Sequence, residues 1–220
     1  MAAVVLLTLG MASCERDDDT KWVDLGLPSG LLWATCNLGA TNSEDYGDYY
    51  AWGETSVKGA YDWSTYRYAT VDADCYLQTL TKYNTSDTYG TIDNKTTLEA
   101  SDDVATAVLG SGARIPTEAE WDELISNTTS ELTTLNGVYG WKFTASNGNS
   151  LFLPAPGLHY DLDLLYDVEE GHYWSSSLRE SKPYIALSFY FNNDPDDSNP
   201  KMYGGRRDYG RSVRAVRSRN

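Results

Sequence analysis

The chain is poor in the residues that carry metal and nucleophilic chemistry. It has two histidines and three cysteines among 220 residues, with no CxxC and no HExxH motif. Ser175, Ser176 and Ser177 lack the flanking glycines of a nucleophile elbow. These absences argue against a zinc site, a thiol-redox site and a catalytic serine. We therefore expect no enzymatic activity.

Basic residues are also scarce. There are 17 Lys and Arg against 32 Asp and Glu, a net charge of −15. Residues 201–220 hold seven of the positive charges and one acid, so this segment carries 7 − 1 = +6 and the first 200 residues carry 10 − 31 = −21. Such an acidic body argues against nucleic acid as a partner. We expect the basic segment to form one distinct face, with Arg214 and Arg217 in internal ion pairs and Arg206 and Arg207 meeting a ligand.

No apolar run is long enough to span a bilayer. The apolar run at residues 2–13 has the length of a signal-peptide core and ends in small residues before Cys14. No basic segment precedes it, so we expect a truncated or miscalled start. An exported compartment permits a disulfide, and we expect Cys36 to pair with Cys75.

Residues 11–14 (Met-Ala-Ser-Cys) resemble a bacterial lipobox, in which the cysteine becomes the lipidated first residue. Residues 15–19 (Glu-Arg-Asp-Asp-Asp) resemble the acidic export tag of surface-exposed lipoproteins of the Bacteroidetes. The resemblance implies a lipoprotein signal peptide at 1–13, an acidic tether at 14–20, and anchoring to outer-membrane lipid through Cys14 at the cell surface. The alternative is a cleaved signal followed by an acidic linker.

Residues 21–220 contain no repeat or long linker, and we expect one α+β domain. Thr117 and Glu120 form a capping box that predicts a helix, with Trp121, Leu124 and Ile125 on its buried stripe. The other expected elements are short strands at 22–27 and 31–36, long ordered loops at 42–94, a helix capped by Ser101 and ended by Gly110, a hairpin at 141–144 and 150–153, and strands at 184–191 and 212–217.

Several segments together resemble the Fibrobacter succinogenes major paralogous domain family. They are residues 23–37, 47–54, 114–121 (Arg-x-Pro-Thr-x-x-Glu-Trp), 147–154, 173–177 and 209–217. The resemblance spans nearly all of 21–220. It implies a C-type lectin-like fold of short antiparallel strands, two helices and long ordered loops, related to the formylglycine-generating enzyme.

Two departures from this pattern matter. The formylglycine-generating enzyme depends on a late pair of reactive cysteines, whereas no cysteine follows Cys75 here. That activity is therefore excluded. Thr128 stands where the resemblance leads us to expect a cysteine. If the family pairs that cysteine with Cys36, its usual bridge is absent from this chain.

The resemblance also implies that loops near the C-terminal strands, residues 178–211, bind the ligand. This stretch is rich in Tyr, Asn and Arg, a mixture typical of recognition surfaces, and it resembles the variable region of retroelement-diversified lectin-fold proteins. The candidate ligand-binding residues are Arg179, Glu180, Lys182, Tyr184, Tyr190, Asn192, Asn193, Met202, Tyr203, Arg206 and Arg207. The alternative is a surface loop whose arginines pair with the acidic body.

A run of oxygen donors follows the predicted strand at 184–191. Asp194, Asp196, Asp197 and Asn199 are candidate ligands for calcium, which takes six to eight oxygens. Asp and Asn are also common simply because they favour turns. Both interpretations stay open.

Three functions remain from different classes. The first is a non-enzymatic, surface-anchored lipoprotein that binds a glycan or a protein of a host or neighbouring cell, as a diversified receptor or adhesin would. The second is a structural subunit at the tip of a fimbria or envelope assembly. The third is a glycan-processing enzyme, which needs two carboxylates facing each other across a sugar. Neighbouring acids are poor indicators of such a pair in a chain this acidic.

Overall fold

The computed structural model describes residues 21–194 and 200–219. The predicted signal peptide, Cys14 and the acidic tether lie outside these residues. Within the described ranges, no helix has both the length and the hydropathy of a transmembrane span.

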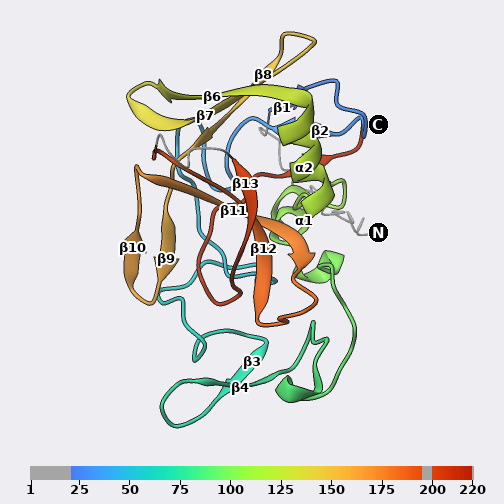
Figure 1. Cartoon of the computed structure of the whole chain (residues 1–220), viewed down its shortest axis with the longest axis vertical. Helices are drawn as coiled ribbons and strands as arrows, with labels where there is room; N and C mark the ends of the chain where they lie inside the picture. Colours follow the sequence, from blue (N-terminus) through green and yellow to red (C-terminus); the bar gives the residue numbers. More distant parts are fainter. Residues whose placement is uncertain (1–20, 195–199, 220) are drawn as a thin grey trace, which may run out of the picture.

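Short antiparallel strands and two α-helices make up the described part of the chain, which confirms the α+β class (Figure 1). The first sheet has the order β1-β2-β14-β5 and contains β1 (Trp22–Asp24), β2 (Leu32–Ala34), β14 (Val216–Arg217) and β5 (Ala113–Arg114). The second has the order β6-β7-β8, with β6 (Thr128–Leu135), β7 (Val138–Ala145) and β8 (Ser150–Pro154). The third contains β11 (Glu170–Leu178), β12 (Ile185–Asn192) and β13 (Lys201–Arg206).

The remaining elements are two hairpins and the helices. The hairpins are β3 (Ala69–Val71) with β4 (Leu77–Leu80), and β9 (Leu158–Tyr160) with β10 (Asp163–Leu165). The helices are α1 (Val104–Leu109) and α2 (Glu118–Asn127), and short 3-10 turns lie at η1 (Asp87–Tyr89) and η2 (Ala100–Asp102).

Helix α2 begins at the predicted capping box. The Thr117 hydroxyl accepts a hydrogen bond from the Glu120 amide, and the Glu120 carboxylate accepts one from the Thr117 amide. One turn later the Trp121 ring stacks on Phe189 of β12, with centroids 4.5 Å apart and planes 11° from parallel. The apolar stripe therefore packs the helix on the third sheet, as its spacing indicates.

Other boundaries differ from the predicted ones. Asp103, rather than Ser101, caps α1, because its carboxylate accepts the amide of Thr106 and also that of Ile115. The predicted strand at 212–217 is reduced to β14. The expected loop region 42–94 contains the β3–β4 hairpin, and β6 follows α2 directly as an antiparallel partner of β7.

Segments without regular structure are fixed by buried tryptophans. The Trp52 indole donates to the carbonyl of Ser175 in β11, and the Trp174 indole of the same strand donates to the carbonyl of Tyr50. Both rings are fully buried in one of the two core clusters. This reciprocal pair holds the loop after Tyr50 against the third sheet, and that loop forms part of the candidate site.

Cys36 and Cys75 are free, so the predicted disulfide is wrong. Cys36 follows β2 in the first sheet, and its thiol lies 3.3 Å from the carbonyl of Thr41. Cys75 is exposed in the turn between β3 and β4, a hairpin that lies at the lower end of the molecule and away from β2 (Figure 1). The fold thus holds the two thiols on separate elements.

Candidate ligand-binding cleft

A cleft of about 640 Å³ opens beside the β3–β4 hairpin. It is built by six separate parts of the chain: the loop at 62–64, the hairpin turn at 74–77, η1, the end of β9, the residue before β12 and the end of β13. The lining residues are Asp62, Trp63, Ser64, Asp74, Cys75, Tyr76, Leu77, Tyr89, Tyr160, Asp161, Tyr184 and Arg206. Ile185 pairs with Arg206 in the third sheet, which places Tyr184 and Arg206 at the same end of that strand pair.

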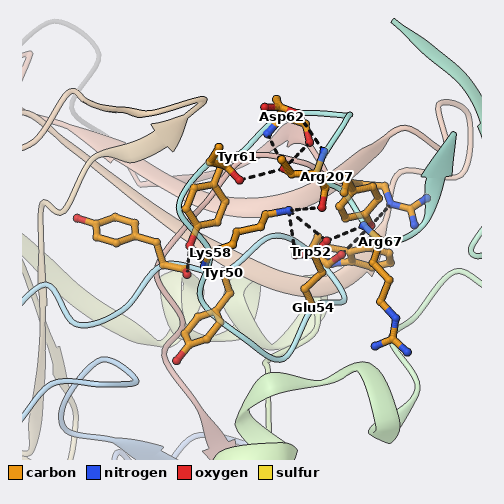
Figure 2. A network of polar contacts seen from close by, with 12 residues as sticks. Tyr50, Trp52, Glu54, Lys58, Tyr61, Asp62, Arg67 and Arg207 are labelled. Carbon is orange, nitrogen blue, oxygen red and sulfur yellow. Dashed lines mark hydrogen bonds and ion pairs between the residues drawn. The ribbon is translucent and has the colours of Figure 1, made fainter. Parts of the chain in front are cut away.

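The loop that carries Asp62 and Trp63 is held by a polar network (Figure 2). The Lys58 ammonium lies 2.9 Å from the Glu54 carboxylate and donates to the Thr65 carbonyl. Glu54 also accepts the amide of Arg67 at 2.7 Å. These contacts join the two ends of the loop, so its cleft-lining residues are positioned before any ligand arrives.

Asp62 organises the turn itself. Its carboxylate accepts the amides of Ser64 and Thr65 and the hydroxyl of Ser64. Although partial burial opposes ionisation, these hydrogen bonds and nearby Lys58 lower the pKa of Asp62 below its ordinary value. The carboxylate is therefore ionised at neutral pH.

Five of the residues that line the cleft are aromatic. Tyr89 and Tyr184 lie with ring centroids 5.4 Å apart, while Trp63 is buried with its ring near Arg206. Two rings remain open to solvent: Tyr76 is 70% exposed and Tyr160 is 40% exposed. Such rings present flat apolar faces with negative electrostatic potential.

Arg206 lies among two of these rings, the ring of Tyr209 and one acid. Its guanidinium carbon is 5.3 Å from the Trp63 ring, 5.5 Å from Tyr160 and 5.1 Å from Tyr209. One of its nitrogens is 2.6 Å from the carboxylate of Asp208, which is fully buried. Burial raises the pKa of Asp208 even though Arg206 favours its ionised form. The positive charge of Arg206 is thus paired with the Asp208 carboxylate behind the cleft lining.

Arg207 does not face a ligand, and that prediction is wrong. The side chain is fully buried and donates to the hydroxyl of Tyr66 and to the carbonyls of Lys82, Tyr83 and Pro183. Its guanidinium lies 5.0 Å from the Trp52 ring. The buried hydrogen bonds of Arg207 therefore connect segments that carry the cleft residues.

Arg214 is also internal, but the predicted ion pair is wrong. The side chain is fully buried and donates to the Asn37 side-chain oxygen at 2.9 Å and to the Ala34 carbonyl at 3.1 Å. Arg211 is equally buried, stacked 4.6 Å from Trp174 and bonded to the Ser188 hydroxyl. Burial lowers the pKa of both arginines. Arg217 lies over the Trp22 ring, at 4.4 Å.

Three predicted ligand residues, Tyr190, Asn192 and Tyr203, lie together on the polar face of the third sheet. The rings of Tyr190 and Tyr203 are 5.7 Å apart, and the Asn192 amide donates to the Tyr190 hydroxyl. That hydroxyl donates to Glu170, which also pairs with buried His172 at 2.7 Å. This group is separate from the lining of the cleft.

The other predicted residues are dispersed. Arg179, Glu180 and Lys182 are exposed in the turn between β11 and β12, and Asn193 is exposed just after β12. Met202 packs against the second core cluster. Of the predicted ligand-binding residues, the cleft therefore brings together Tyr184 and Arg206.

Three of the four predicted calcium ligands, Asp196, Asp197 and Asn199, lie outside the described residues. Asp194 is exposed, and its amide donates to the Asn192 side chain. In the ranges 21–194 and 200–219, no group of three or more His, Cys, Asp or Glu side chains is arranged to hold a metal ion. Calcium binding by residues 194–199 stays a prediction.

Most of the cleft residues were missed by sequence reasoning. The sequence feature that could have identified them is the abundance of Tyr and Asp in 42–94, a region that was predicted to form loops and was given no functional role. The arrangement joins flat aromatic faces to carboxylates within one concavity, which suits reversible binding of a small polar ligand. Comparison of the chain with protein-family models, with curated proteins and with solved structures finds no match.

Proposed function

We propose that the protein is a non-enzymatic binding module that takes a glycan into the aromatic cleft. The lining of the cleft is the observation that supports this proposal. A sugar ring has an apolar C–H face and a hydroxyl edge. Tyr76 and Tyr160 offer faces for the first, while Asp74, Asp161 and Arg206 offer hydrogen-bonding groups for the second.

The size and rigidity of the cleft favour the same function. A volume of about 640 Å³ is typical of small-ligand sites. Trp63 and Arg206 are fixed by contacts within the wall, and the loop at 62–64 is fixed by Asp62. A wall that is already ordered loses little conformational entropy when a ligand binds.

We further propose that the domain is C-type lectin-like and belongs to the Fibrobacter succinogenes major paralogous domain family. Its place is the outer surface of the outer membrane, where lipid on Cys14 anchors it and residues 15–20 keep the domain off the bilayer. A hydrated acidic body with net charge −21 over its first 200 residues is compatible with that position.

The anchor is tested by metabolic labelling. A fatty-acid analogue should label the protein in cells that make it, and the variant Cys14→Ala should lose the label because no thiol remains at the lipobox. In cell fractionation, the variant should be absent from the membrane pellet, whereas the unaltered protein should be found there. Equal labelling of the two proteins would rule out this anchor.

The glycan-binding proposal is tested on a glycan array with the purified full chain. Tyr76→Ala and Tyr160→Ala should each weaken binding about tenfold, because each removes an exposed ring worth about 1.4 kcal/mol of stacking. The matched control is Tyr139→Ala, since this tyrosine is 49% exposed on β7 and does not line the cleft. Its affinity should equal that of the unaltered protein.

The array also separates the competing functions. Equal loss from Tyr139→Ala and from the two cleft variants would place binding elsewhere. A chain that bound no glycan but captured a purified surface protein through Tyr76 and Tyr160 would replace the glycan with a protein ligand.

A further inference from the structure

Acids outnumber bases around the cleft. Asp62, Asp74 and Asp161 line it, and Arg206 is the one basic residue among the lining residues that the structure describes. The lining of the cleft therefore carries three carboxylates and one guanidinium.

Two basic residues at the cleft are already paired with acidic residues. Arg206 lies 2.6 Å from the Asp208 carboxylate, and Lys58, behind the wall, lies 2.9 Å from that of Glu54. Each pair contributes no net charge, so three negative charges remain. An anionic ligand would have to share the Arg206 guanidinium with the buried Asp208 carboxylate, which already accepts from its Nε and one terminal nitrogen.

Two of the lining carboxylates are available to a ligand. Asp74 and Asp161 are exposed, and within the described part of the chain neither carboxylate has a hydrogen bond or ion pair. Asp161 adjoins Tyr160, and Asp74 belongs to the same turn as Tyr76. Each exposed ring thus has an unpaired acid beside it.

Carboxylates next to aromatic faces attract the same kind of group. Rings bind cations through their negative faces, and carboxylates bind ammonium groups through charge-assisted hydrogen bonds. On the basis of the proposed glycan binding, we propose that the cleft selects sugars with a free, protonated amino group over their N-acetylated and anionic counterparts. Asp74 and Asp161 are the residues that would receive the ammonium.

The test is a matched comparison of probes. Oligomers of glucosamine, galactosamine and mannosamine are presented to the full chain in free-amine and fully N-acetylated forms, at a pH where the amine is protonated. The free-amine form of the sugar that binds should bind about fivefold to tenfold tighter, the effect of two charge pairs near a surface. Raising the salt concentration should reduce that preference.

Variants locate the selectivity. Asp74→Asn with Asp161→Asn should remove the preference for the amine, so that the free-amine and N-acetylated forms bind this variant with affinities within about twofold of each other. Asp161 has a positive φ of 54°, which Asn tolerates as readily, so the backbone should be unaffected. The control, Asp122→Asn with Glu131→Gln, removes two exposed charges from α2 and β6 and should keep the preference.

The possible failures are distinguishable. If N-acetylated, neutral or anionic sugars bind as tightly as the amines, the amine selectivity is refuted while glycan binding stands. If the amine preference survives Asp74→Asn with Asp161→Asn, another site is responsible. If no sugar binds in either form but a lysine-containing peptide does, both the selectivity for amino sugars and the proposed function fail.

Discussion

Replacing Arg207 with alanine should lower the free energy of unfolding by at least about 4 kcal/mol. The variant removes the donor from the buried carbonyls of Tyr83 and Pro183 and from the partly buried carbonyl of Lys82, and it opens a cavity beside the Trp52 ring. Each buried acceptor left unsatisfied costs about 1–3 kcal/mol, and the lost packing adds to this. Urea unfolding followed by tryptophan fluorescence measures the change.

Two further variants separate the role of Arg207 from a general effect of losing an arginine. Arg179→Ala removes an exposed side chain and should change stability by less than about 0.5 kcal/mol. Arg207→Lys should remain well below the unaltered protein, because one ammonium cannot reproduce a planar fork with four partners. A stability loss for Arg207→Ala no larger than that for Arg179→Ala would contradict the internal role.

Acidification from pH 6.5 to pH 4 should remove about 3 kcal/mol of stability through His172 alone. Burial lowers the pKa of this histidine from 6.5 to about 4, with Arg211 acting in the same direction and Glu170 opposing it. As the pH falls below 6.5, the unfolded chain takes up a proton that the folded protein does not accept until about pH 4. Stability from this group is therefore complete above 6.5 and is lost as the pH falls.

The pH effect is isolated by comparing unfolding curves of the protein and His172→Gln across that range. Carboxylates also destabilise the fold in acid, but their contribution is common to both proteins. The fall in stability should be about 3 kcal/mol smaller in the variant. His159→Gln, which alters a less buried histidine, should change the fall by less. Parallel curves for the protein and His172→Gln would refute the prediction.

Sequence patterns predicted elements whose signals are local. The capping box of α2 and the alternation along 184–191 each lie within a dozen residues, and the structure has both, with β12 at Ile185–Asn192. Strand β6 was missed because its sequence, TTSELTTL, has little apolar alternation. It is a strand because β7 pairs with it along its whole length.

The basic C-terminal segment shows why charge alone misled the prediction. Arginine is rarely buried, so a net +6 indicated a surface face. Instead, Arg207, Arg211 and Arg214 are fully buried, with carbonyls, hydroxyls, an amide oxygen and aromatic faces as partners. The composition suggested that the Tyr and Trp residues form a binding face. Some of their rings instead contact the buried arginines and stabilise the buried positive charge.

The cleft could not be predicted from the sequence for a topological reason. Its walls come from parts of the chain as distant as Asp62 and Arg206. None of these parts contains a sequence motif that predicts which other segments it contacts. Only the register of Ile185 with Arg206 and the fixing of the 54–67 loop bring them together. Composition indicated a Tyr-rich binding surface, and the tertiary structure decided where it lies.

The strand order β1-β2-β14-β5 has a consequence for the timing of folding. Strand β2 pairs with β1 on one side and with β14 on the other, and Arg214 reaches the Ala34 carbonyl across 180 residues of chain. Contacts that close such long loops form slowly. A chain that emerges N-terminus first, from a ribosome or a translocation pore, must hold β2 without this neighbour until Val216 and Arg217 arrive. The first sheet is therefore completed after the β6-β7-β8 sheet and after the β11-β12-β13 sheet have all their strands.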